Sequence, residues 1–401
     1  MSPKRIAEPD HFPWLDYRRY TFSLGVEKGG VVFLSGETAS QYDAATDRVV
    51  CHGNVVEQMR LAYEKLRLSL ESLGGGFEDV VKTVDYVAPA GLADYRGTAG
   101  VRREHFEGRW PASTGVVVER LLRPDALIEV DAVAVLGREK EPVDPGWPRY
   151  ERLTYAPGVR AGDLLCVSGF TGAMEDAAGQ RRYPGSAAEQ TSAAHDAIGQ
   201  VLRAAGAGRG DVGKSLDYIT PACLEGYAAA GEARHRFPKD RLPASTGVGI
   251  NRLLHPDALI EVEATAVLGA PRQEIDVHGW LALDGPPAPA AVRQGQFLFI
   301  SGQTAVDHRT GAVVGEGDIL AQTTQVYSNL KAVLEAAGGS MADVMKTTEF
   351  ITPPGLRGYR SVGDLRRDFF GGEFPAATGV VVTSLPRPEL LIQVDATAIL
   401  D

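Results

Sequence analysis

The chain has 401 residues, of which 44% are apolar and 23% charged, as in ordinary globular proteins. Its formal net charge of −11 argues against nucleic acid as a partner, because binding a phosphate backbone requires a basic surface. No apolar run reaches the roughly 18 residues of a membrane span, and the polar start MSPKRIAEPDHF lacks a signal-peptide core, so we expect a cytoplasmic protein without a membrane partner.

The first third of the chain predicts strands and helices in alternation. Short stretches rich in β-branched residues predict strands, whereas longer stretches with apolar residues at helical spacing predict helices. We expect strands at 31–36, 79–87, 114–121 and 126–136, and helices at 53–75 and 92–106. This order is typical of an α+β fold in which helices cover one face of a sheet.

The same pattern is then written twice more. PASTGVVVERLLRPDALIEVDAVAVLG at 111–137 returns as PASTGVGINRLLHPDALIEVEATAVLG at 243–269 and as PAATGVVVTSLPRPELLIQVDATAILD at 375–401. A spacing of 132 residues exceeds the roughly 20–50 residues of solenoid repeats and is the size of a domain. The sequence therefore predicts three domains, joined by charged or proline-rich surface connectors. Their expected bounds are 1–139, 140–271 and 272–401.

A sheet that carries helices on one face must bury its other face elsewhere. Three such sheets in one chain can bury theirs against each other, which predicts a pseudo-threefold barrel of sheets with the helices outside. In that arrangement, binding clefts fall between adjacent repeats. We expect the chain to be a monomeric pseudo-trimer or a loose dimer.

Cysteine and histidine usage gives no indication of a metal. Cys51, Cys166 and Cys223 occupy non-equivalent positions in the repeats, so they form no disulfide framework and no paired metal knuckle. The eight histidines include no closely spaced pair of ligands. We predict that the protein needs no metal and no cofactor, and that its partner is a small-molecule substrate.

The third repeat carries a series of motifs that resembles a known family. It runs SGQTAVDHRTGAVVGEGDILAQTTQVYSNLKAVLEAAGGSMADVMKTTEFIT from residue 301, and FPAATG and LIQVDA follow. These motifs, in this order, resemble the RidA (YjgF-type) enamine/imine deaminase family, and the likeness covers nearly all of every repeat. The resemblance implies RidA-like (chorismate-mutase-like) domains, a trimer made covalent, and hydrolysis of reactive enamines or imines to ketones and ammonia.

One residue of that family is absent from all three repeats. Deaminating members have an arginine after F-P-A, which pairs with the substrate carboxylate, whereas this chain has Ser113, Ser245 and Ala377. Strand alternation points Arg120 away from the Ser113 face, so we expect no simple replacement. The loss favours a substrate that has no carboxylate or that is held by another cation. We predict that Ser113 and Ser245 contact this substrate.

An acid recurs in the last strand of every repeat. By resemblance, it matches the glutamate with which the family positions or activates water, so the predicted catalytic residues are Asp131, Glu263 and Asp395. Strand alternation places Glu129 on the face of Asp131, and the equivalent partners are Glu261 and Gln393. If such a pair is partly desolvated, one carboxyl has a raised pKa and donates a proton near neutral pH. The alternative is a solvated or ion-paired polar face that lines a central channel.

A second set of acids, Asp85, Asp217 and Glu349, stands where the family has an apolar strand residue. An acid within a strand is costly unless it is paired, so substrate binding is one interpretation. A water-exposed edge or a salt bridge to a neighbouring arginine is the other. Tyr155, thirteen residues before Ser168, matches a tyrosine that contacts the ligand in relatives and is also predicted to bind substrate.

Two classes of function follow from these observations. The first is a divergent RidA-like hydrolase, deaminase or tautomerase that acts on an imine, enamine or enol-type metabolite, with a role in specialised metabolism. The second is a non-catalytic protein that binds or scavenges a small molecule. A hydrolase or lyase like the chorismatases, which are pseudo-trimers of a similar fold, is a further alternative by analogy of fold alone.

Overall fold

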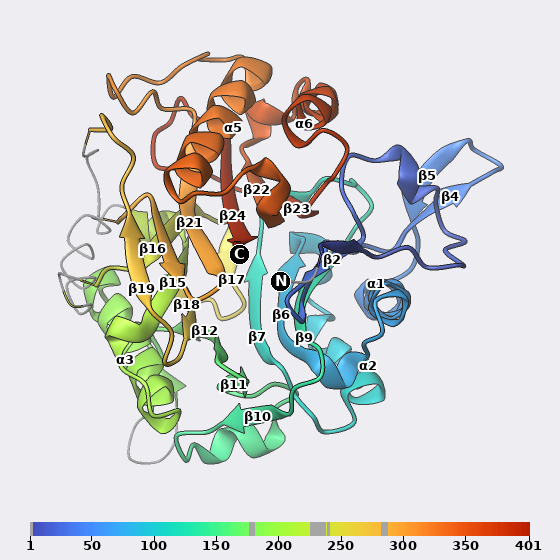
Figure 1. Cartoon of the computed structure of the whole chain (residues 1–401). Coiled ribbons are helices and arrows are strands. Elements are labelled where there is room, and N and C mark those ends of the chain that lie inside the picture. Colours follow the sequence, from blue (N-terminus) through green and yellow to red (C-terminus); the bar gives the residue numbers. More distant parts are fainter. Residues whose placement is uncertain (1–2, 176–180, 225–237, 239–240, 282–287) are drawn as a thin grey trace.

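The computed structural model describes residues 3–175, 181–224, 238, 241–281 and 288–401 (Figure 1). Three mixed sheets of six or seven strands follow one another along the chain. In each sheet the last long strand of the repeat lies in the centre and pairs antiparallel with both neighbours. The structure therefore has three repeated α+β domains, as the sequence predicts.

The three sheets have equivalent strand orders. The first sheet contains, from one edge to the other, β1 (Arg5–Ile6), β2 (Gly25–Lys28), β3 (Val31–Leu34), β9 (Ile128–Val135), β6 (Val80–Val87), β7 (Ala112–Val117) and β17 (Arg252–Leu253). The second contains β10 (Lys140–Val143), β11 (Gly158–Ala161), β12 (Leu164–Thr171), β18 (Ile260–Val267), β15 (Val212–Ile219) and β16 (Ala244–Gly249). The third contains β19 (Arg272–Ile275), β20 (Ala291–Gln294), β21 (Phe297–Thr304), β24 (Ile392–Ile399), β22 (Val344–Ile351), β23 (Ala376–Val381) and β8 (Arg120–Leu121). Two separate hairpins are β4 (Ser40–Asp43) with β5 (Arg48–Cys51), and β13 (Met174–Glu175) with β14 (Arg181–Arg182).

A long helix lies on the outside of each repeat, with the strands between them in the middle of the molecule (Figure 1). These helices are α1 (Val55–Ser72), α3 (Ala187–Ala204) and α5 (Ile319–Ala336). Shorter helices, α2 (Thr98–Phe106) and α6 (Val362–Phe370), follow in the first and third repeats. The counterpart expected in the second repeat lies outside the described residues.

A recurring glutamine fixes each long helix to its sheet. The Gln58 side chain donates to the Asp125 carbonyl at 3.0 Å and accepts from the Leu127 backbone N–H at 2.8 Å. Gln190 and Gln322 make the same two contacts in their own repeats. Because both ends of the amide are satisfied, this residue recurs at the same position in all three repeats.

The inner faces of the sheets pack against each other in shared apolar clusters. One cluster joins Phe33 of the first repeat, Val159 of the second and Phe299 of the third, all buried. Another contains the equivalent residues Tyr86, Tyr218 and Phe350. Each repeat thus buries its inner face with the help of the other two. Among the described residues the strands form open sheets, and the closed pseudo-threefold barrel stays a prediction.

The predicted connectors contain strands. β10 begins at Lys140 and pairs antiparallel with β11, and β19 begins at Arg272 and pairs with β20. Each strand therefore extends the sheet of the repeat that follows it. The charged and proline-rich composition concealed both strands because each lies at the edge of its sheet, where charges and prolines are tolerated.

The strand expected at 114–121 is interrupted. β7 ends at Val117, and Arg120 lies in β8, which pairs with Val381 of the third sheet. The equivalent strand β17 of the second repeat pairs with β7 of the first. Arg120 therefore does not belong to the strand that contains Ser113, and alternation along that strand does not fix the direction of its side chain. Each short strand instead extends the sheet of the preceding repeat: β17 extends the first sheet, and β8 extends the third.

We predict that Phe299→Ala lowers the free energy of unfolding by about 3–5 kcal/mol. Phe299 is 3% exposed and stacks on Phe297, with ring centroids 5.5 Å apart, so truncation leaves a cavity where the repeats meet. Urea unfolding at pH 7 measures the change. Tyr42→Ala is the control, because Tyr42 is 53% exposed and its removal should cost within about 0.5 kcal/mol. Equal stability of the two variants would contradict the shared core.

Candidate active site between the repeats

The same polar residues meet wherever two repeats join. We call the contacts between repeats 1 and 2, 2 and 3, and 3 and 1 the first, second and third junctions. At the first junction, Lys82 Nζ lies 2.9 Å from a carboxylate oxygen of Glu263. Thr114 Oγ1 donates to the same oxygen at 2.5 Å, and the lysine also donates to the Val167 carbonyl at 2.8 Å. The carboxylate of the second repeat is thus neutralised by the first.

The other two junctions repeat this arrangement. Asp395 lies 2.5 Å from Lys214 Nζ and accepts from Thr246 Oγ1 at 2.5 Å. Asp131 lies 3.1 Å from Lys346 Nζ and accepts from Thr378 Oγ1 at 2.9 Å. The three acids predicted to be catalytic are therefore ion-paired across the junctions. This geometry is the ion-paired alternative that the sequence left open, and a catalytic role for these acids stays a prediction.

A second carboxyl lies two residues before the ion-paired acid in the first two repeats. Glu261 is directly opposite Tyr218, as Glu263 is opposite Leu216, so both acids lie on one face of β18. Glu261 and Glu129 are each 6% exposed. Burial raises the pKa of both carboxyls to about 8, and the neighbouring charge of Glu263 or Asp131 is the next cause. Each is therefore a carboxylic acid that keeps its proton at pH 7.

A glycine of each repeat lies against this acid. A Cβ on Gly169 would lie 2.1 Å from Glu261 Oε1, so a side chain there would displace the carboxyl. From the preceding repeat, the Gly115 backbone hydrogen-bonds to the same carboxyl. Glu129 has equivalent neighbours at the third junction, Gly36 and Gly379. The Ser-Gly motif of one repeat thus faces the acid, while a strand of the preceding repeat, β7 or β23, holds it.

The second junction lacks this acid. Gln393 occupies the equivalent position. It faces Gly302 in the same way, because a Cβ on Gly302 would lie 2.3 Å from Gln393 Nε2. An amide has the shape of a carboxyl but carries no dissociable proton in this pH range. The three junctions therefore differ in their capacity for acid–base chemistry.

The predicted serines lie at different junctions. The Ser113 backbone N–H donates to Ser168 Oγ at 2.8 Å, which joins the first repeat to the second. The Ser245 backbone N–H donates to Ser301 Oγ at 3.0 Å, which joins the second repeat to the third. Ser245 therefore lies with Gln393, not with Glu263 of its own repeat. The order of the repeats around the molecule decides this grouping.

The second acid set lies on the opposite, helix-facing side of the strands. Asp85 is fully buried, pairs with Arg102, and accepts from Tyr95 Oη at 2.7 Å. Glu349 accepts from Arg366 and Tyr359, each at 2.5 Å. Asp217 is also fully buried. These contacts satisfy both carboxylate oxygens of Glu349, whereas Asp85 Oδ1 is buried without a hydrogen-bond partner among the described residues. Substrate binding by this set stays a prediction.

Tyr155 reaches the first junction. The next residue, Ala156, donates its N–H to the Pro111 carbonyl of the first repeat at 2.9 Å. The half-buried Tyr155 ring packs edge-on against Tyr150, with centroids 5.6 Å apart. The first junction therefore combines Tyr155 and Glu261 of the second repeat with Ser113 of the first.

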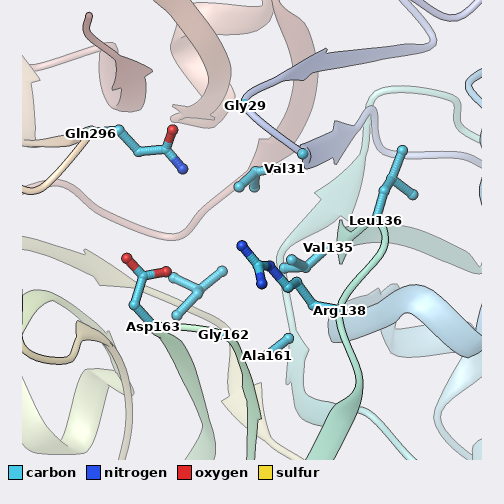
Figure 2. Close-up of a pocket in the computed structure, with 11 residues that line it drawn as sticks. Gly29, Val31, Val135, Leu136, Arg138, Ala161, Gly162, Asp163 and Gln296 are labelled. Carbon is cyan, nitrogen blue, oxygen red and sulfur yellow. The ribbon is translucent and has the colours of Figure 1, made fainter. Parts of the chain in front are cut away.

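A cavity of about 350 Å³ lies where β-turns of the three repeats meet (Figure 2). Gly29, Gly162 and Gln296 contribute to its lining, and the Arg138 side chain extends between them. None of the junction acids lines it. Within the described residues, no group of three or more histidine, cysteine, aspartate or glutamate side chains is placed to hold a metal ion. None of the helices in that part of the chain is both long and apolar enough to span a membrane.

Comparison with known proteins agrees with this geometry. The family model Ribonuc_L-PSP (Endoribonuclease L-PSP) matches residues 17–136, 150–268 and 286–400. The chain belongs to this RidA-type family. One repeat is 40% identical over 112 residues to a RutC family protein of Pyrococcus horikoshii, covering 28% of this chain and 86% of that protein.

Two further likenesses concern an enzyme and a fold. The 2-iminobutanoate/2-iminopropanoate deaminase of Salmonella typhimurium is 36% identical over 116 residues, which cover 28% of this chain and 87% of the deaminase. A solved chorismatase structure covers 81% of this chain and 94% of its own, with a TM-score of 0.50 and 16% identity. The latter likeness extends over the three RidA-type repeats and shows the fold alone.

Sequence reasoning undervalued two sets of residues. Lys82, Lys214 and Lys346 recur at the spacing of the repeats and were assigned no role from the sequence, although a lysine at a fixed strand position is itself a sign of a buried ion pair. Glu129 and Glu261 were considered only as neighbours of the predicted catalytic acids. Their environment depends on glycines of an adjacent repeat, and no sequence spacing reports that contact.

We predict that Glu261→Gln stabilises the chain at pH 8 and reduces the loss of stability between pH 5 and 8. The folded pKa of about 8 lies above the ordinary value of 4.5, so the folded state holds this proton more tightly than the unfolded state. Stability therefore falls as pH rises between these two values, and an amide removes this slope. Urea unfolding across this pH range measures the effect. Gln393 shows that an amide fits the site, and an unchanged slope would contradict the raised pKa.

Proposed function

We propose that the chain is a RidA-type hydrolase that converts a small imine or enamine to a carbonyl compound and ammonia at the first and third junctions. The observation that carries the proposal is the buried acid, Glu261 or Glu129, whose pKa of about 8 keeps it protonated at neutral pH. Family membership and the deaminase name of the Salmonella relative support the reaction type. General acids of this kind work best when their pKa lies near the working pH.

The buried acid acts twice in the proposed reaction. Glu261 donates its proton to the substrate, at the nitrogen of an imine or at the carbon of an enamine, which leaves an electrophilic C=N carbon. Its carboxylate then accepts a proton from the water that attacks this carbon. Glu261 passes that proton to the amine nitrogen, and the C–N bond then breaks as the C=O bond forms. The carboxylate takes the remaining hydroxyl proton, so that one water is consumed, one ammonia leaves, and Glu261 regains its proton.

The ion-paired acids support this chemistry in the proposal. Glu263 and Asp131 each pair with a lysine, and their charge helps to raise the pKa of the neighbouring carboxyl. The neighbour of Asp395 is Gln393, an amide that has no carboxyl pKa to raise. We therefore assign the second junction a structural role. Ser113 and Tyr155 are the proposed substrate contacts at the first junction.

Two other functions remain as alternatives. A protein that only binds or scavenges a small molecule needs shape but no proton donor, so the raised pKa values favour catalysis over this alternative. A chorismatase-like hydrolase or lyase is supported by the fold likeness alone. The distinction between a deaminase and this second enzyme rests on the substrate that is turned over.

We predict that the native chain releases ammonia from 2-iminopropanoate generated in situ or from at least one uncarboxylated imine or enamine in a panel. The double variant Glu129→Gln/Glu261→Gln should lose at least about 100-fold in kcat/KM, the lower range for removal of a general acid–base group. Each single variant identifies the junction that turns over the substrate. Coupled detection of ammonia and loss of the substrate chromophore provide the measurement.

Glu335→Gln is the charge-matched control, because Glu335 is exposed on α5 and pairs only weakly with Lys331 at 3.8 Å. Glu263→Gln separates the roles of the two acids. If this change abolishes turnover while Glu261→Gln does not, the catalytic acid is Glu263 and the proposed assignment is wrong. A native chain that turns over none of the panel would favour a non-catalytic binding protein.

A further inference from the structure

The hairpin beside the first junction carries an exposed arginine. At every junction the lysine is matched by an ion-paired acid, and the adjacent position holds either a protonated carboxyl or an amide. At the first junction, the hairpin of β13 and β14 adds Arg181, which is directly opposite Glu175 in the strand pairing. Among the side chains that the structure describes, Arg181 has no ion-pair partner.

Arg181 is held beside the buried acid. Its Nη2 donates to Thr171 Oγ1 at 3.2 Å, and Thr171 is directly opposite Glu261 in the pairing of β12 with β18. Side chains at such opposed positions lie about 4.5–5.5 Å apart at Cβ. The guanidinium also lies 5.7 Å from the ring centroid of Tyr183, which stacks on His255 at 4.4 Å. The exposed arginine is thus oriented towards one rim of the junction.

The field of this arginine reaches the site. Its positive charge opposes the effect of burial on the pKa of both Glu261 and Tyr155. Thr171 occupies only one of the five N–H donors of the guanidinium, which leaves in-plane donors at its edge for an anion. An oxyanion bound there would lie within the length of a small molecule from the Glu261 carboxyl.

This arginine is specific to the second repeat. The glutamines that fix the long helices, Gln58, Gln190 and Gln322, make equivalent contacts and therefore align the repeats. Nine residues before each glutamine stand Val49, Arg181 and Val313. At this position the arginine therefore occurs in the second repeat alone, whereas the hairpin of the first repeat carries Arg48 one residue earlier.

The third junction has a different extra cation that is already satisfied. Lys65 is fully buried, lies 3.6 Å from Glu37, and donates to the Thr38 and Ser40 carbonyls. Lys65 occupies the position that Asn329 holds in the third repeat, and Asn329 also donates to backbone carbonyls there. We therefore assign the Lys65–Glu37 ion pair a structural role beneath the hairpin.

We propose that Arg181 binds the carboxylate of the substrate at the first junction, taking over from the hairpin side the role of the arginine that is absent at Ser113. This inference rests on the proposed function and deepens it. The first junction is then selective for small carboxylate-bearing imines, while the third junction takes uncharged ones. A guanidinium is suited to this task because its fork matches the two oxygens of a carboxylate.

Calorimetric titration with 2-oxobutanoate and with its uncharged methyl ester tests this inference. The native chain should bind 2-oxobutanoate at one site, and Arg181→Ala should weaken this binding at least tenfold while leaving the ester unaffected. Arg182→Ala is the matched control, because Arg182 is the exposed neighbour on the same strand, and it should bind both probes as the native chain does. Arg181→Lys keeps the charge without the fork and should restore binding only in part.

Equal binding of 2-oxobutanoate to the native chain and to Arg181→Ala, or no binding to the native chain, would overturn the inference. The outcome is separable from that of the proposed function. Turnover of uncarboxylated imines by a chain that does not bind 2-oxobutanoate would retain the enzyme and reject the anion site. Binding through Arg181 without turnover of any imine would retain the anion site and reject the enzyme.

Discussion

The lysine–carboxylate pair at each junction is the interaction on which the rest of the molecule depends. Lys82 and Glu263 belong to different repeats and are both largely buried, so neither charge is compensated unless the two sheets meet in one register. A buried pair of this kind adds little net stability, but loss of one partner is costly. The pair therefore favours specificity of assembly, and its carboxylate also raises the pKa of the acid that we propose for catalysis.

Fusion of the three repeats allows these junctions to differ. In a homotrimer, a change at one junction appears at all three, whereas here Gln393, Arg181 and the Glu37–Lys65 pair each occur once. The shared apolar clusters and the helix-anchoring glutamines remain common to all repeats. The positions that diverge are those around the buried acid, where a change alters ligand chemistry at little cost to the fold.

The fold was largely predictable, because the 132-residue period and the β-branched strands are local features of the sequence. Alternation also placed Glu129 and Asp131 on one face correctly. The partners of these acids were not predictable, since Lys346 is 215 residues from Asp131 and meets it only through the order of the repeats. The strand expected at 114–121 is not continuous for a related reason: the short strand that contains Arg120 pairs with another repeat.

NMR of a chain labelled with ¹³C at the glutamate carboxyl carbons tests the central claim most directly. We expect two glutamate resonances that titrate near pH 8, one lost in Glu129→Gln and the other in Glu261→Gln. Glu37 should titrate separately, near pH 7. Titration of every glutamate close to the ordinary pKa of 4.5 would contradict the claim that the junctions hold protonated acids at neutral pH.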